Sequence, residues 1–476
     1  MEITWLGALL IPLGVLLLAV APKWLQPITV FSIPFTATSL LNSSSGVPLS
    51  PLQFFGTLFV IRQLFSSRFG RILRVKREDR SQLLLLLFMS VAVLSMIMPL
   101  IINGKILVSS SQLHDLYEEP LRLTVHNIKN PLPVIFGVIL SMCLIFANNT
   151  PEKIRSTIKV YVMAGVFVGL WGYFQFLCDS VLNIQYPYYL FNNALIETMQ
   201  GYGWQIEIGG DLYSRISSVT HEASIFSKYL LTVLPLVLVA VWLRRPLFSI
   251  FRDRCVLVML VGILVLTTST TAYFGMICSV FLTAFLLRHL RAIGWRWAIY
   301  VGLISAVCFV AYRVSPVFQD FVDALLLMKY ESGSALERTL SVINSWEYFR
   351  QYPILGVGWA MVTSHNLITF LLVSSGIVGL IMFMILCVYV FYRSLQTLRR
   401  INVNRVLKDR GMLVLVSGLV VSLITLVLMG ILTGLEFYLG YFYFVLSMLI
   451  ASNLVVLSQR ANAELKVNLS IAEAER

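Results

Sequence analysis

Charged residues are scarce in this chain of 476 residues: Asp, Glu, Lys and Arg make up 12% of it, whereas 58% is hydrophobic. A soluble domain carries about 25% charged residues, so most of this chain lacks the composition of a soluble protein. The six cysteines stand singly, without a CxxC spacing, which argues against a disulfide framework or a zinc site. Walker and GxGxxG motifs are also missing, which argues against a pump driven by ATP bound to this chain.

Long apolar runs recur instead from end to end, many of them near the ~20 residues that a membrane helix needs. They predict an all-α, polytopic transmembrane bundle of about 12–14 helices, with the whole chain, 1–476, as a single membrane domain. The first run has no basic flank and no cleavage site, so we expect it to stay as a helix. Span 28–42 contains a Pro and several Ser and Thr, so a re-entrant segment is its alternative. The predicted spans are 3–20, 28–42, 49–65, 82–100, 131–147, 158–177, 225–242, 255–269, 272–287, 297–313, 366–391, 412–430 and 437–456.

The basic residues are confined to short segments between these runs, as in the cytoplasmic loops of membrane proteins. The net charge of +13 therefore indicates membrane topology rather than binding to nucleic acid. The segments predicted to be cytoplasmic are 62–77, 244–254, 288–296, 393–410 and the tail 458–476. The loops predicted to be extracytoplasmic, which hold four of the five histidines, are 101–130, 178–224 and the large loop 314–365.

An imidazole stands where a long polar segment meets an apolar run, because His365-Asn366 closes loop 314–365. This position places a proton acceptor at the membrane surface, where water, lipid head groups and sugars meet. Asn366 is suited to cap the helix that follows. Upstream, residues 336–350 suit an amphipathic helix on the membrane face, and a Pro with two glycines predicts a tight turn at 353–358.

Several of these features together resemble the signature of the O-antigen ligase and polymerase superfamily. The residues that carry the resemblance are Arg338, Trp346, segment 353–358, His365-Asn366 and segment 376–380, whose Gly376 and Gly379 permit close helix packing. Segment 214–230, which contains Arg215 and the triplet Glu222-Ala223-Ser224, is similar to a stretch of the polymerases. The turn at 268–275 resembles a small-residue turn of the same proteins, although it lacks the Arg that the ligases usually carry nearby. The resemblance is therefore closest to the O-antigen polymerases.

The resemblance implies an inverting, lipid-pyrophosphate-dependent glycosyltransferase in the bacterial inner membrane, with its active site facing the periplasm. Its substrates would be oligosaccharides carried on undecaprenyl pyrophosphate, and the growing glycan would move to an incoming lipid-linked repeat unit. A separate chain-length regulator would be a further partner. The alternatives are a ligase that moves finished glycan to lipid A core or protein, and a polysaccharide transporter or flippase. The predicted spans are mostly free of charge at their centres, which favours an enzyme over an alternating-access carrier.

Transfer of this kind needs a base for the acceptor hydroxyl and cations for the departing pyrophosphate. A positioned His contributes about 10²–10⁴-fold as a general base, and His365 is the predicted catalytic base. Arg binds phosphate bidentately and keeps its charge, so Arg215 and Arg338 are predicted to hold the pyrophosphate. The residues expected to bind the acceptor sugar or to orient these groups are Glu222, Asn366 and Tyr273.

Several of these residues have structural alternatives. Glu222 could instead be the buried partner of Lys228, and Tyr273 could lie in the core. Glu436 is expected to be solvated in the last outer loop, where it could also line a substrate groove. Segment 114–119 (His-Asp-Leu-Tyr-Glu-Glu) offers hard oxygen ligands for a divalent cation, as some membrane glycosyltransferases use. Because no Asp-x-Asp pair accompanies it, we expect catalysis without a metal and without a cofactor.

Overall fold

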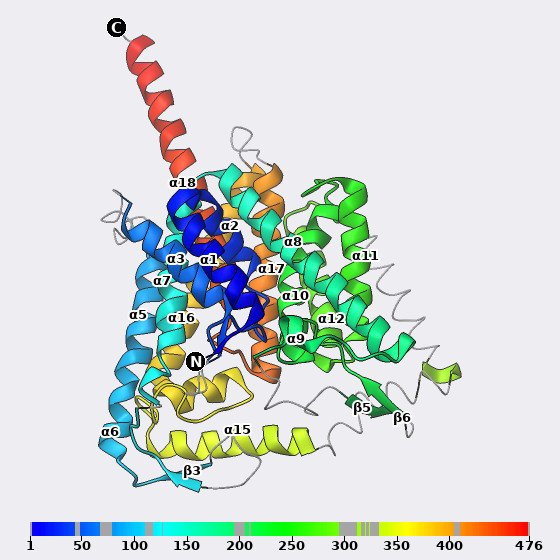
Figure 1. The fold of residues 1–476 in the computed structure, drawn as a ribbon. Helices are drawn as coiled ribbons and strands as arrows, with labels where there is room; N and C mark the ends of the chain where they lie inside the picture. The colour runs from blue at the N-terminus through cyan, green and yellow to red at the C-terminus, as the bar shows by residue number, and fades with distance from the viewer. Residues whose placement is uncertain are drawn as a thin grey trace.

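A bundle of long apolar helices makes up the protein (Figure 1), and the described residues also form three short two-stranded sheets. Eight helices are long and apolar enough to cross a membrane, or nine if the bent pair α1–α2 forms one span, among the residues that the structure describes. The all-α polytopic fold is thus confirmed. This computed structural model describes residues 2–42, 48–66, 79–109, 118–125, 127–194, 205–208, 211–294, 312–315, 319, 323, 333–403 and 410–474.

Most predicted spans correspond to helices, although span 297–313 lies almost wholly outside the described residues. The α-helices are α1 (Trp5–Val20), α2 (Leu25–Phe31), α3 (Pro51–Leu64), α5 (Ser81–Leu94), α6 (Met98–Ile102), α7 (Leu132–Ala147), α8 (Pro151–Phe176), α9 (Tyr188–Phe191), α10 (Ala223–Trp242), α11 (Ile250–Leu266), α12 (Thr270–His289), α15 (Gly333–Gln351), α16 (Leu367–Val403), α17 (Arg410–Thr433) and α18 (Gly440–Ala474). The short helices are η1 (Pro22–Trp24), η2 (Ser95–Ile97), η3 (Asn127–Lys129) and the π-helix η4 (Leu177–Leu182).

The three sheets are antiparallel pairs that lie outside the helical core. Glu2 pairs with Asn42, Leu107 with Pro120, and Gln205 with Ser214 at the ends of their registers. The strands are β1 (Glu2–Ile3) with β2 (Leu41–Asn42), β3 (Leu107–Ser109) with β4 (Glu118–Pro120), and β5 (Gln205–Ile208) with β6 (Asp211–Ser214).

The continuous helix predicted at 28–42 is wrong, because the backbone from Ser32 to Asn42 is not helical, and whether α1 and α2 form a broken span or a re-entrant segment stays open. Helix α2 ends at Phe31 and meets α1 at a bend of 119°. The irregular backbone that follows is satisfied by a neighbouring loop: Ser39 N–H donates to Asn193 Oδ1 at 2.7 Å, and Asn193 Nδ2 donates to Ser39 O at 3.0 Å. Such side-chain bonds allow non-helical backbone to lie within a membrane protein, because few water molecules are present to satisfy it.

Helix α10 lies in the middle of the bundle and packs against α8, α11, α12 and α17. Every residue from Ala223 to Ala240 is buried, including Lys228. A helix that is buried on all sides cannot slide or rotate without disturbing its neighbours. It therefore fixes the position of the residues that directly precede it. The segment 215–222, which precedes α10, is therefore anchored to the rigid core.

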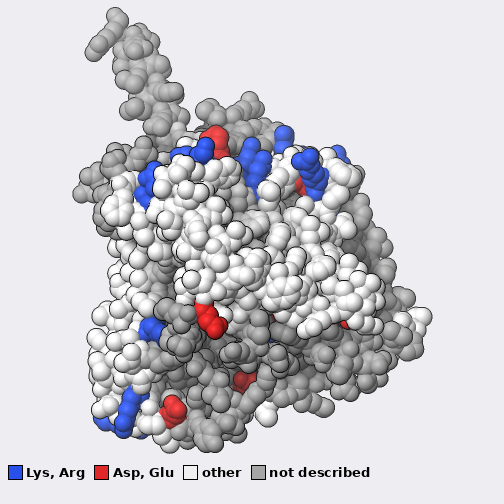
Figure 2. All heavy atoms as spheres, viewed as in Figure 1, with Lys and Arg blue, Asp and Glu red and all other residues white. Residues whose placement is uncertain are grey.

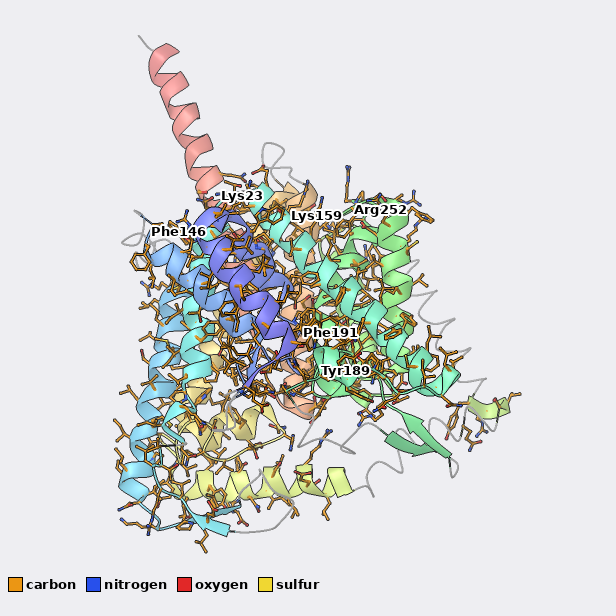
Figure 3. The ribbon with its side chains drawn as sticks, viewed as in Figure 1. Lys23, Phe146, Lys159, Tyr189, Phe191 and Arg252 are labelled. Carbon is orange, nitrogen blue, oxygen red and sulfur yellow. The ribbon has the colours of Figure 1, made fainter. Side chains whose placement is uncertain are left out.

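Positive charge gathers at one end of the bundle on the face that Figure 2 shows. Figure 2 shows Lys and Arg gathered at one end above a broad uncharged band. Lys23, Lys159 and Arg252 lie at this end (Figure 3), which we call the basic end. Helix α15 runs across the opposite end, the α15 end, together with β3 and the β5–β6 hairpin (Figure 1).

Helix α16 is broken at Gly376, and the turn at 353–358 fills the break. Gly376 has φ +65° and ψ −166°, which interrupts a helix of 37 residues. The backbone groups freed by the break bond to the turn: Val357 N–H donates to Val373 O at 2.7 Å, and Ile377 N–H donates to Pro353 O at 2.9 Å. The close packing expected at Gly376 is thus made with a turn and not with a second helix. The break sets residues 367–375, which follow His365, as a separate short helical segment.

Replacing Gly376 by alanine is expected to destabilise the protein, because a Cβ there would lie 2.1 Å from Ile354 O. The positive φ adds a strain of about 1–3 kcal/mol for a residue other than glycine. Thermal unfolding of the purified protein measures the effect. Gly294→Ala is the matched control, since nothing lies within 4 Å of a Cβ at that position. Equal unfolding temperatures for the two variants would contradict this account of the break.

Candidate active site

Three predicted site residues from separate segments converge at the α15 end. Arg215 follows β6, Arg338 belongs to α15, and His365 precedes α16. The charge of Arg338 acts on both the Arg215 guanidinium and the His365 imidazole, so the three side chains lie within electrostatic reach of one another. Segments separated by more than a hundred residues thus meet at one place.

Arg215 is partly enclosed by the protein. Burial lowers its pKa, the neighbouring charge of Arg338 lowers it further, and the Glu222 carboxylate and Tyr273 act in the opposite direction. Because a guanidinium keeps its proton even at buried sites, two positive charges act on one another here. Such a pair favours the binding of an anion with more than one negative charge.

His365 is half-buried and carries a lowered pKa. Burial is the main cause, and the positive charge of Arg338 is the second. The carboxylates of Glu337, Glu222 and Glu436 act in the opposite direction but do not cancel the shift. The imidazole is therefore neutral at neutral pH and has a free lone pair with which to accept a proton.

Asn366 fixes the start of α16 beside the imidazole. Its Oδ1 accepts hydrogen bonds from the N–H groups of Ile368 at 2.8 Å and Thr369 at 3.2 Å, which confirms the predicted cap. Its Nδ2 donates to Ile431 O at 2.7 Å, near the end of α17. These bonds orient the segment that carries His365. Contact of Asn366 with a sugar stays a prediction.

Glu222 and Tyr273 both lie near Arg215. The exposed Glu222 accepts a hydrogen bond at Oε2 from Ser224 Oγ at 2.9 Å, and its charge acts on Arg215 and on His365. The Tyr273 hydroxyl donates to Val265 O at 2.8 Å, at the end of α11. The Glu222 charge thus acts on both the cation and the imidazole, whereas the Tyr273 hydroxyl joins α12 to the end of α11.

Residues 255–384 match the family model described as O-antigen ligase. The chain carries an O-antigen ligase-family domain. The match supports the O-antigen ligase/polymerase superfamily, whose members are glycosyltransferase-like enzymes. No curated protein matches this chain.

The O-antigen ligase-family domain includes some of the converging residues and not others. Tyr273, Arg338 and His365 lie within the matched segment, whereas Arg215 and Glu222 lie before it. The site is therefore completed by the segment that precedes α10. The family match and the apolar helices together indicate a multi-pass membrane enzyme.

One alternative for Glu222 is excluded, and the expectation for Glu436 is wrong. Lys228 does not pair with Glu222: its Nζ lies 2.6 Å from Glu436 Oε1. Glu436 is consequently not a solvated loop residue, since only 22% of its side chain is exposed. A lysine within an apolar span needs a partner of opposite charge, so the sequence indicated that Lys228 forms an ion pair. The distance along the sequence favoured Glu222, the nearer carboxylate.

His221, which directly precedes Glu222, is not among the predicted site residues. Burial lowers its pKa to about 4, and the Glu222 charge opposes this shift. Its Nδ1 is buried and has no hydrogen-bond partner among the described residues. A neutral imidazole, with one ring nitrogen that makes no hydrogen bond among the described residues, thus lies beside the candidate site. The sequence feature that could have indicated it is its position two residues before α10.

Most of the segment that could bind a divalent cation lies outside the described residues. Segment 114–119 lies outside the described residues, apart from the backbone of Glu118 and the residue Glu119 in β4. Among the described residues, no group of three His, Cys, Asp or Glu is arranged to hold a metal ion.

Proposed function

We propose that this protein is a polysaccharide polymerase. It transfers a growing glycan from undecaprenyl pyrophosphate to an incoming lipid-linked repeat unit on the outer face of the inner membrane. The observation that carries the proposal is the convergence of Arg215, Arg338 and a neutral His365 at one end of a membrane bundle. Glycosyl transfer from a lipid pyrophosphate needs two cations for the leaving group and one base for the acceptor.

The geometry supports a single displacement. His365 takes the proton of the acceptor hydroxyl as its oxygen attacks the anomeric carbon of the growing glycan. The bond from that carbon to the pyrophosphate oxygen breaks, and its electron pair leaves with the lipid pyrophosphate. Arg215 and Arg338 stabilise the charge that develops there. A one-step attack from the opposite face inverts the anomeric centre, and Glu222, Asn366 and Tyr273 orient the acceptor and these groups.

The charge asymmetry supports the orientation. Cytoplasmic ends of membrane proteins are enriched in Lys and Arg, so the basic end is proposed to face the cytoplasm. The α15 end, with loops 101–130, 178–224 and 314–365, then faces the exterior. Helix α18 continues past the bundle at the basic end (Figure 1), which supports a cytoplasmic tail at 458–476.

A ligase is the second candidate, because the matching family is described as O-antigen ligase. Ligase and polymerase share the donor and differ in the acceptor, which is lipid A core or protein in one and a lipid-linked repeat unit in the other. A flippase is less well supported, since the converging charged groups lie at one end of the bundle and carriers bind near the midplane.

The proposal is tested by incubating the purified protein with repeat units linked to lipid pyrophosphate, with and without a chelator. We expect a ladder of glycans, each longer by one unit, together with release of lipid pyrophosphate, and no effect of the chelator. Addition of lipid A core separates the two candidates. Transfer to the core without a ladder would support a ligase, and no transfer to either acceptor would overturn both. A separate chain-length regulator is expected to change only the length distribution.

A further inference from the structure

The ion pair between Lys228 and Glu436 joins the core helix α10 to the loop between α17 and α18. Lys228 is 1% exposed, and its Nζ donates to Glu436 Oε1 at 2.6 Å and to Gly434 O at 2.7 Å. The second carboxylate oxygen of Glu436 accepts a hydrogen bond from the Tyr441 hydroxyl at 3.2 Å. Both oxygens are thus held, and the carboxylate has a fixed position.

The same loop packs directly on the residue that we propose as the base. A Cβ at Gly434 would lie 3.4 Å from the Cα of His365, so the two backbones are in contact. The next aromatic residue, Phe437, is buried with its ring centroid 5.4 Å from that of Trp359, which follows the 353–358 turn. The loop that carries Glu436 is therefore clamped between α10 and the segment around His365.

Stability alone is a weak reason for such a pair. Removing two charges from water costs more than their attraction often returns, and apolar side chains of similar size stabilise a core equally well. The pair therefore calls for a reason besides stability.

We propose that Glu436 is a positioning residue, which Lys228 holds as a carboxylate beside His365. There it stabilises the imidazolium that forms when His365 accepts the proton of the attacking hydroxyl. The inference rests on the proposed function, and it adds a residue and a role that the family resemblance does not supply. No atom is gained or lost at Glu436, since the proton remains on the imidazole until it passes to water.

Four charged groups act on His365. In decreasing order of effect, they are Arg338 and Glu337 from α15, Glu222 just before α10, and Glu436 from the loop between α17 and α18. Glu222 and Glu337 are exposed, so water screens their charges more strongly. Glu436 is mostly enclosed and tied at both oxygens, which makes it the carboxylate whose position depends least on side-chain motion.

The test uses Glu436→Gln and the double variant Lys228→Met with Glu436→Gln in the full-length protein. The single variant leaves a buried lysine without a carboxylate to balance its charge, whereas the double variant removes both charges and so protects the fold. We expect kcat to fall roughly tenfold or more in both folded variants. This loss is a part of the rate enhancement of about 10²–10⁴-fold that a positioned general base contributes. The KM for donor and acceptor should not change.

A second measurement does not depend on glycan transfer. The pH dependence of diethyl pyrocarbonate labelling, resolved for His365 by mass spectrometry, reports the pKa of that imidazole without substrate. Because the Glu436 charge raises the pKa of His365, its removal should move the midpoint to lower pH. Glu347→Gln, an exposed carboxylate on α15, is the control and should leave both the rate and the midpoint unchanged.

The outcomes separate a structural role from a positioning role. If the double variant transferred glycan at the wild-type rate, the pair would serve only the fold and the inference would be overturned. An unshifted His365 midpoint would overturn it as well. If the wild-type protein transferred no glycan, the proposed function would fail, while the labelling experiment would still decide whether Glu436 acts on His365.

Discussion

Replacing His365 by alanine should lower the rate of glycan transfer by about 10²–10⁴-fold, the usual contribution of a positioned general base. The fold should survive, because the half-buried imidazole is not part of the closely packed core and its backbone N–H bond to Ser341 Oγ, at 3.4 Å, remains possible. Donor binding should persist, since both arginines are retained. Initial rates and donor KM with the purified variant measure the effect.

His289→Ala is the matched control, because this histidine ends α12 near Arg399 and is not among the residues that converge with His365. It should transfer glycan at the wild-type rate. If His365→Ala retained full activity while expressed at normal levels, His365 would have no part in the chemistry.

The pH profile follows from the same imidazole. Its pKa lies below the ordinary value of 6.5, chiefly because of burial and then because of Arg338. A base acts when unprotonated, so activity should be lost only as the pH falls through that lowered pKa, at a pH below 6.5. Arg338→Gln should move the acidic limb to higher pH, opposite to the shift expected for Glu436→Gln. An acidic limb above pH 6.5 in the wild type would contradict a neutral, buried base.

The helices were predictable from the sequence because each depends on an apolar run of local extent. The clustering of Arg215, Arg338 and His365 was suggested by the family resemblance and by their place near helix ends on one side. Local patterns could not show that Gly376 breaks a helix, since the carbonyl and amide groups that it frees are satisfied by a turn twenty residues earlier. The sequence showed only a glycine at a position where close packing is common.

The partner of Lys228 could not be predicted for a related reason. Two carboxylates were available, and Glu222 is six residues away whereas Glu436 is more than two hundred residues away. Helix geometry decides between them, because Glu222 precedes the first turn of α10 and bonds to Ser224 instead. Similarly, the sequence of 28–42 alone could not show that this segment is not a continuous helix. Its irregular backbone is hydrogen-bonded by the side-chain amide of Asn193, which lies in a distant loop.

Changing Arg215 or Arg338 to lysine is expected to impair transfer severely, although the charge is kept. Lysine offers a point charge, whereas the guanidinium fork donates two parallel hydrogen bonds to a phosphate. Each hydrogen bond to a charged group contributes about 1.5–3 kcal/mol, so the loss of one should lower kcat/KM by roughly ten- to a hundredfold. Steady-state kinetics with a lipid-pyrophosphate donor measure it.

Arg350→Lys is the matched control, since Arg350 is exposed on the same helix as Arg338 and lies 5.9 Å over the ring of Trp346. It should transfer glycan normally. The double variant of Arg215 and Arg338 should lose less than the product of the single effects, because two groups that hold one pyrophosphate act as a unit. Independent, multiplicative losses would instead place the two guanidinium groups on different substrates, with one of them on the acceptor.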